Sequence, residues 1–344
     1  MIITSFLVLV ALTAASPIGM DEDYAESSKN QSKSIQGVSE QEFSSFKFYS
    51  QHAGAAYCNS NAAPGTRVTC EKKNCPLVEQ NNVTIVSSFG GQLTGIAAYV
   101  AIDKIRQEIV LSVRGSNNLR NFITDVNFIW RGCALVKNCF LHSGFLQSWE
   151  EIQDAAKQTI SSTSAQNPGF RVVATGHSLG GAVATLAAAY LRRDGIPVDI
   201  FSYGSPRVGN GAFAQWMTKA PGAQWRVTHA DDPVPRLPPI IFGYRHISPE
   251  YWLVGVKAGE TTVTPAQVKV CPGIANTQCN AGTFGLNIPA HLDYLGPISE
   301  CGPPSIQLRR RDDVDKAELE RRLNDWSRKD QEFVKDQEEK SERV

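Results

Sequence analysis

One short segment in the middle of the chain restricts the possible folds more than any other. Residues 172–182 read VVATGHSLGGA, so Ser178 stands between Gly176 and Gly180, after a β-branched run and before a stretch of helical composition. This order matches G-x-S-x-G, in which a serine occupies a sharp turn between a strand and a helix. The turn strains the serine backbone and leaves no room for flanking side chains, which explains the glycines. The segment predicts that Ser178 is a nucleophile; an ordinary serine in a glycine-rich turn is the alternative.

Short apolar runs alternate with helical segments on both sides of this turn. The runs are rich in β-branched residues and bounded by turns, as buried strands are. The expected strands lie at 109–113, 171–174, 198–203 and 225–228, and the expected helices at 145–161 and 182–193. This alternation predicts an α/β fold with a mostly parallel sheet that helices cover on both faces.

The 344 residues allow one large domain with extensions. Residues 1–15 carry no charge and hold a dense apolar run followed by small residues, which predicts a secretory signal peptide and an extracellular protein. The run is too short to span a bilayer, and no later segment is long enough, so no transmembrane helix is expected. The acidic stretch 16–37 is expected to be a propeptide or flexible leader, and 38–301 the packed catalytic domain.

Residues 302–344 form a tail of different composition. It holds 11 Lys or Arg and 12 Asp or Glu residues, with Leu319, Leu323 and Trp326 at helical spacing. A solvated helix or disordered tail is the favoured interpretation, and a helix that docks through this narrow stripe is the alternative. The basic run 309–311 is suited to a secretory-pathway protease, so the residues beyond it are expected to be dispensable or inhibitory.

Charge and cysteine content narrow the possible partners. The formal net charge is zero, which gives no argument for binding nucleic acid. The chain is also expected to be a monomer. Eight cysteines suit an exported protein with disulfides. Three pairs are close in sequence, and 105 pairings are possible. The histidines and cysteines lack zinc-ligand spacing, so neither a metal nor a cofactor is expected. Sequons at Asn30 and Asn82 permit glycosylation.

A serine nucleophile needs a base and an orienting carboxylate, which in this type of fold follow in the order Ser, Asp or Glu, His. Three histidines follow Ser178, namely His229, His246 and His291. His291 is favoured because it lies late, where the last loop of such a sheet returns to the nucleophile. Asp231 and Asp232 follow an expected strand, and order alone does not separate them.

The residues between 41 and 301 resemble the secreted class 3 lipases of filamentous fungi, and among them the Fusarium-type extracellular lipases. The blocks that carry this resemblance are 113–116 (VRGS), 142–145 (HSGF), 176–182 (GHSLGGA), 203–210 (YGSPRVGN), 228–239 (THADDPVPRLPP) and 288–292 (IPAHL). Their order and spacing together are highly specific. The resemblance implies an α/β-hydrolase fold with a helical lid.

The resemblance also implies roles for individual residues. It makes Asp232 the acid and His291 the base, and it assigns the oxyanion hole to Ser116 and to the backbone N–H of Leu179. The implied disulfides are Cys58–Cys301, Cys70–Cys75 and Cys133–Cys139, with Cys271–Cys279 as the additional bridge of the Fusarium-type members.

The family position of the lid is the segment just after Ser116. The apolar side chains of this segment fall on one helical face and would cover the site in water and turn toward lipid at an interface; they are Leu119, Phe122, Ile123 and Val126. A permanently packed core helix is the alternative.

The resemblance and the apolar face of the lid imply a triacylglycerol lipase that acts at a lipid–water interface without a cofactor. The resemblance to the Fusarium-type members also suggests phospholipase A1 activity as an addition. Two alternatives are a feruloyl or other carboxylesterase of the same fold and a non-catalytic lipid-binding protein. Ser116 and the apolar lid face argue against the first, and the intact Ser178, Asp232 and His291 argue against the second.

Overall fold

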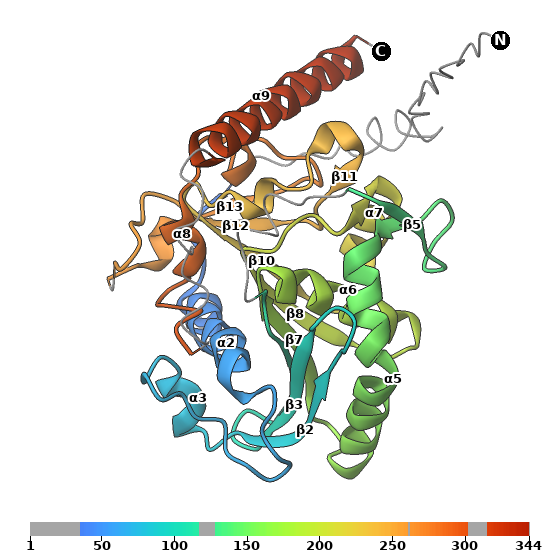
Figure 1. Cartoon of the computed structure of the whole chain (residues 1–344), viewed down its shortest axis with the longest axis vertical. Helices are drawn as coiled ribbons and strands as arrows, with labels where there is room; N and C mark the ends of the chain where they lie inside the picture. The colour runs from blue at the N-terminus through green and yellow to red at the C-terminus, as the bar shows by residue number, and fades with distance from the viewer. Residues whose placement is uncertain (1–34, 117–127, 261, 302–314, 344) are drawn as a thin grey trace, which may run out of the picture.

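A nine-stranded sheet forms the centre of the computed structural model, which describes residues 35–116, 128–260, 262–301 and 315–343 (Figure 1). Its strands run in the order β1 (Ile35–Gln36), β13 (Val268–Cys271), β12 (Glu250–Leu253), β10 (Gln224–His229), β8 (Val198–Tyr203), β7 (Arg171–His177), β4 (Glu108–Val113), β3 (Ala97–Asp103) and β2 (Thr84–Gly90). The five strands from β12 to β4 are parallel, and antiparallel strands flank them at both edges.

The central strands form because both of their faces are buried. All six residues of β4 are buried, and alternate side chains enter opposite cores. Ile109 and Leu111 pack on the side of α5 (Ser143–Gln166) and α6 (Leu179–Arg193), whereas Val110 packs on the side of α2 (Glu40–Asn59). Figure 1 shows α2 on one face of the sheet and α5 with α6 on the other. The expected α/β fold with a mostly parallel sheet is therefore confirmed.

Smaller elements complete the body of the molecule. The remaining helices are α3 (Pro76–Gln80), α7 (Gly211–Lys219), α8 (Ile288–Leu292) and α9 (Asp315–Glu342), and single 3-10 turns are η1 (Val234–Arg236), η2 (Ile240–Phe242), η3 (Pro265–Gln267) and η4 (Asn280–Gly282). A second sheet has the order β11 (Tyr244–Arg245), β9 (Gly209–Asn210), β6 (Phe140–His142) and β5 (Trp130–Gly132). Within the described ranges, no helix is both long and apolar enough to cross a membrane.

The tail differs from its favoured interpretation. Residues 315–342 form the 28-residue helix α9, and Leu319 and Leu323 are buried against the catalytic body instead of facing solvent. The expected stripe was correct in spacing, since Trp326 packs partly buried in the same cluster. The high density of charge masks this docking in the sequence, because many of the charged side chains form exposed pairs on the other faces of the helix.

Four disulfides link the cysteines: Cys58–Cys301, Cys70–Cys75, Cys133–Cys139 and Cys271–Cys279. This is the pairing that the resemblance implied. Cys58–Cys301 joins α2 to the last loop before the tail and spans 243 residues, whereas Cys271–Cys279 spans eight.

The difference in loop length predicts a difference in stability. Replacing both Cys58 and Cys301 with serine should lower the free energy of unfolding by about 5 kcal/mol, because the unfolded chain regains the freedom of a very long loop. Replacing Cys271 and Cys279 in the same way should cost about 2 kcal/mol. Urea unfolding under oxidising conditions measures both; equal losses would contradict the loop-length argument.

Candidate active site

Ser178 lies in a strained turn between β7 and α6. Its backbone angles are φ 57° and ψ −130°, a left-handed region that residues other than glycine rarely adopt. Its N–H donates to the carbonyl of Tyr203 at 2.9 Å, which attaches the turn to the end of β8. The side chain stands at the carboxyl edge of the parallel strands, next to the N-terminus of α6 and the partial positive charge there.

Two glycines let the chain approach closely enough to form this turn. A Cβ on Gly176 would lie 2.3 Å from the carbonyl oxygen of Gly180. A Cβ on Gly180 would lie 2.2 Å from the carbonyl oxygen of Val113 at the end of β4. Since real Cβ atoms do not come so near a backbone oxygen, any side chain here would force the turn apart. The sequence argument for glycine at these positions agrees with the observed contacts.

Asp232 and His291 form a buried pair beside this turn. His291 Nδ1 contacts Asp232 Oδ2 at 2.8 Å and Oδ1 at 3.0 Å, and both side chains are almost wholly buried. A carboxylate accepts only, so Nδ1 carries the proton and Nε2 has its lone pair available. Nε2 is buried and makes no hydrogen bond to the described part of the chain. His291 thus has one nitrogen fixed and the other ready to accept a proton.

Asp232 is held by further donors that the sequence did not reveal. Tyr294 donates its hydroxyl to Asp232 Oδ2 at 2.5 Å, and the backbone N–H of Val234 donates to Oδ1 at 2.9 Å. Burial first, and then the neighbouring Asp232 carboxylate, raise the pKa of Tyr294 well above its usual range, so the phenol remains a donor. The sequence signal for Tyr294 is only its position three residues after His291.

His177 links the Ser178 turn to the segment that carries His291. Its Nε2 contacts the carbonyl oxygen of His291 at 2.8 Å, so Nε2 is the protonated nitrogen and Nδ1 accepts from the Tyr57 hydroxyl at 2.8 Å. Burial and, second, the nearby His291 hold the pKa of His177 well below its ordinary value. His177 is therefore a neutral spacer that lies next to both Ser178 and His291, with the two imidazole ring centres 4.5 Å apart.

The other candidate acids and bases have different surroundings. Asp231 Oδ1 accepts from the side-chain amide of Asn287 at 2.7 Å and makes no hydrogen bond to His291 in the described residues. His229 faces the backbone carbonyls of Ala290, Asp293 and Val256 with its two nitrogens.

The third histidine, His246, donates from Nε2 to the carbonyl of Pro235 at 2.7 Å. The structure therefore brings Asp232 and His291 together and gives Asp231, His229 and His246 supporting contacts.

The two expected oxyanion donors lie close to the nucleophile in the chain. Leu179 is the first residue of α6 and follows Ser178 directly. Ser116 comes three residues after the end of β4, the strand that pairs with β7 in parallel. The expected lid residues Leu119, Phe122, Ile123 and Val126 fall in 117–127, outside the described residues.

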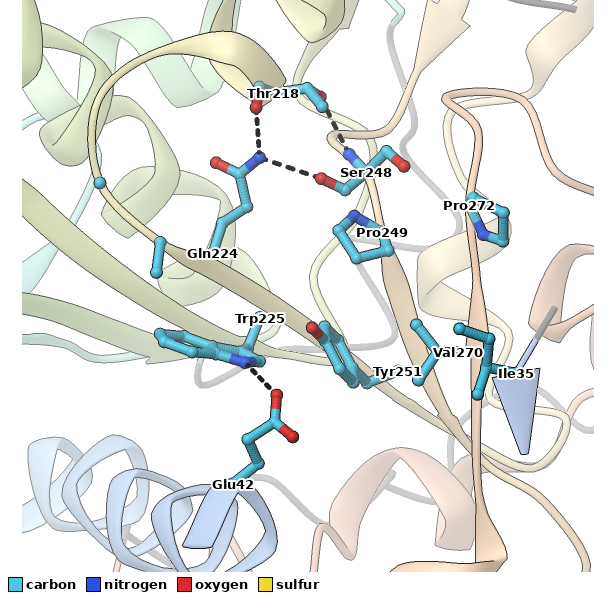
Figure 2. A pocket seen from close by; sticks show the side chains of 12 residues that line it. Ile35, Glu42, Thr218, Gln224, Trp225, Ser248, Pro249, Tyr251, Val270 and Pro272 are labelled. Atoms are coloured by element: carbon cyan, nitrogen blue, oxygen red, sulfur yellow. Dashed lines mark hydrogen bonds between the residues drawn. The ribbon is translucent and has the colours of Figure 1, made fainter. Parts of the chain in front are cut away.

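A shallow pocket of about 520 Å³ lies elsewhere on the molecule (Figure 2). It adjoins the amino-terminal ends of β10 and β12, whereas Ser178 follows the carboxyl-terminal end of β7. Its polar groups already bond to one another, since Gln224 donates to the carbonyls of Thr218 and Ser248 at 2.9 Å. This pocket is separate from the Asp232–His291 pair.

Comparison with known proteins agrees with this geometry. The family model of class 3 lipases matches residues 110–242. A relative from Fusarium solani, named secreted mono- and diacylglycerol lipase 1, is 51% identical over 97% of this chain and 99% of its own. The chain belongs to the class 3 lipases. It is an ester hydrolase of this family, and the prediction of secretion is confirmed by the naming of this relative as secreted.

Solved structures show the same fold for the lipase. The crystal structure of a mono- and diacylglycerol lipase from Aspergillus oryzae is 37% identical, with a TM-score of 0.73 over 77% of this chain and 99% of that one. A triacylglycerol lipase described as having a serine protease triad is 28% identical, with a TM-score of 0.70 over 78% of this chain and 100% of that one. The α/β-hydrolase fold is thus confirmed.

The structural role of His246 predicts a pH effect on stability. Burial, and after it Arg226 and Arg207, hold the pKa of His246 well below its ordinary value of 6.5 in the folded lipase. The unfolded chain binds a proton there below pH 6.5 and the folded chain does not, so stability is highest above this pH and falls as the pH decreases. His246→Gln keeps an N–H donor for Pro235 but does not titrate.

The free energy of unfolding should therefore depend less on pH in His246→Gln than in wild type. Between pH 6 and pH 4.5 we expect the slope to differ by about 1.4 kcal/mol per pH unit, which corresponds to one proton. Urea unfolding across this range measures the slope. Identical slopes would mean that His246 is protonated in the folded state.

Proposed function

We propose that the lipase hydrolyses acylglycerols through an acyl-enzyme on Ser178, with His291 as general base and Asp232 as its orienting carboxylate. The observation that supports this most strongly is the Asp232–His291 pair, which lies beside the Ser178 turn. Nε2 of His291 is buried and makes no hydrogen bond within the described residues. Because Nδ1 is occupied by the carboxylate, only Nε2 can receive the serine proton.

Acylation proceeds in two proton movements. Ser178 Oγ attacks the ester carbonyl while His291 Nε2 takes its proton, and the resulting imidazolium is stabilised by Asp232. The oxyanion is held by the backbone N–H of Leu179 and by Ser116; each such donor contributes roughly 10²–10³ in rate in known serine hydrolases. His291 then gives the proton to the leaving alcohol. Water repeats the sequence on the acyl-enzyme and releases the fatty acid.

Mono- and diacylglycerols are the substrates best supported for this chain. The 51% identical relative is named for them, and so is the solved Aspergillus oryzae lipase. The triacylglycerol preference inferred from the sequence stays a prediction, supported by the name of the 28% identical structure. The division into leader, catalytic domain and tail, the monomeric state and interfacial action through a lid just after Ser116 also stay predictions.

Neighbouring carboxylates offer a matched test of the proposed triad. Ser178→Ala should lower hydrolysis of a water-soluble ester by about 10⁶-fold, and Asp232→Asn by about 10⁴-fold because the histidine then takes the wrong tautomer. Asp231→Asn should cost less than tenfold, since that carboxylate contacts Asn287 and not His291. Steady-state kinetics with thermal melts as folding controls measure these losses. A larger loss in Asp231→Asn than in Asp232→Asn would refute the assignment of the acid.

The substrate class is tested on a panel of emulsified mono-, di- and trioleoylglycerol, phosphatidylcholine and methyl ferulate. We expect release of oleate from the mono- and diacylglycerols to be fastest and ferulate to be inert. Rates above and below the solubility limit of a short-chain ester report interfacial action, with Ser178→Ala as the blank. Ferulate turnover with inert glycerides would rule out the acylglycerol proposal.

A further inference from the structure

The C-terminal helix α9 packs against the segments that carry both the acid and the base. Its buried Leu319 and Leu323 contact a cluster that contains Val234 and Leu237, just after Asp232. The partly buried members of the same cluster come from both sides of His291, from position 128 and from α9 itself; they are Leu286, Ile288, Leu292, Phe128 and Trp326. The apolar face of α9 is therefore shared with the catalytic loops.

Polar contacts attach α9 to the loop that leads into α8, the helix of His291. Asn324 Oδ1 accepts from the backbone N–H of Gly285 at 2.7 Å. Gly285 has φ +92°, a conformation that glycine adopts without strain and that other residues rarely adopt. Asn324 thus holds a single amide six residues before His291.

A second contact reaches the same loop through a buried arginine. Arg236 donates from Nη1 to the Ser327 hydroxyl at 3.1 Å and to the carbonyl of Thr283 at 3.0 Å, and from Nη2 to the carbonyl of Gly285. Arg236 and Ser327 are both buried. Arg236 therefore connects the segment just after Asp232 to the loop 283–287, and Ser327 of α9 holds the guanidinium group of Arg236 in place.

A buried carboxylate anchors the middle of α9. Asp330 accepts from the backbone N–H groups of Ile240 and Ile241 at 2.8 and 3.0 Å, and it pairs with Arg207 at 3.3 Å. Both charged side chains are at most 3% exposed. An arginine buried in this way needs a counter-charge, because leaving one partner alone in the interior is costly. Asp330 is the carboxylate that the described structure gives to Arg207.

The loop held by α9 continues directly into the N-terminus of α8. Asn287 caps this helix by accepting from Ala290 N–H at 3.1 Å and donates to Asp231 at 2.7 Å. The short segment that leads to His291 is therefore held at two positions. Gly285 bonds to α9, and Asn287 bonds to the loop of Asp231 and caps α8.

We propose that α9 is a positioning element of the catalytic site, in which Asn324 and Ser327 hold the loop 283–287 so that His291 meets Ser178. The proposal rests on the proposed roles of Ser178 and His291. It differs from the expectation that the residues beyond 311 are dispensable or inhibitory, since α9 accepts a hydrogen bond from the amide of Gly285 and a buried one from Arg236. Small displacements of a base relative to its nucleophile lower rates strongly, by up to about 10²-fold per ångström.

Full-length variants at Asn324 test the proposal. Asn324→Leu keeps the size of the side chain and removes the acceptor for Gly285, whereas Asn324→Asp keeps an acceptor oxygen. Arg321→Ala is the matched control, because Arg321 lies on the same helix and pairs only with Glu318 in an exposed contact among the described residues. Ser327→Ala provides a second, independent removal at the Arg236 contact.

The readouts are kcat and KM on a water-soluble ester, the pH profile of kcat, and the rate at which a phosphonate ester labels Ser178. We expect Asn324→Leu to lower kcat and the labelling rate in parallel, by about tenfold or more, with KM within twofold of wild type. Ser327→Ala should lower both in the same direction. Asn324→Asp should restore most of the loss and Arg321→Ala should behave as wild type. A thermal melt identifies variants that are folded.

Three results would overturn the proposal. The first is an unchanged kcat in folded Asn324→Leu and Ser327→Ala. The second is a loss of kcat in Arg321→Ala equal to that in Asn324→Leu. The third is a kcat in Asn324→Asp as low as in Asn324→Leu. If Asn324→Leu does not fold, Ser327→Ala alone decides by the same criterion. Failure of the proposed function is separate, because it would appear as activity or phosphonate labelling that survives in Ser178→Ala.

Discussion

The close approach of the α6 turn to the end of β4 is the constraint on which the rest of the site depends. Gly180 lies so near Val113 that a side chain would not fit, and Ser178 in the same turn has a strained backbone conformation. The parallel pairing of β4, β7 and β8 holds the two sides of this contact in register. Ser178 therefore stands at the edge of the sheet, and His177 beside it reaches the carbonyl of His291.

The nucleophile turn and the layers around it could be predicted from the sequence because their determinants are local. Two glycines, a β-branched run and a helical run are adjacent in the chain, and β4, β7, β8 and β10 lie where apolar runs predicted strands. The base could be favoured by chain order, and the acid only through family resemblance. Asp231 and Asp232 differ solely in which way each side chain turns, a property of the folded loop.

The supporting residues could not be predicted because their partners are distant in sequence. Tyr57 lies 120 residues from His177, and Tyr294 lies 62 from Asp232. The docking of the tail differs from the favoured prediction for a related reason. Asp330 is one of 12 acidic residues beyond 301, and nothing in the local pattern marks it as the one that is buried against Arg207. Composition describes the many residues of α9 that are not buried, whereas its docking depends on the few that are.

The position of α9 after the catalytic body in the sequence has a consequence for the order in which the enzyme is assembled. A polypeptide is made from its N-terminus, so the strands and the Ser178 turn are synthesised well before residue 315. Arg207 can form its ion pair only after Asp330 has been added, more than 120 residues later. The interior of the catalytic body is thus completed only after residue 330 has been synthesised, long after the strands and the Ser178 turn.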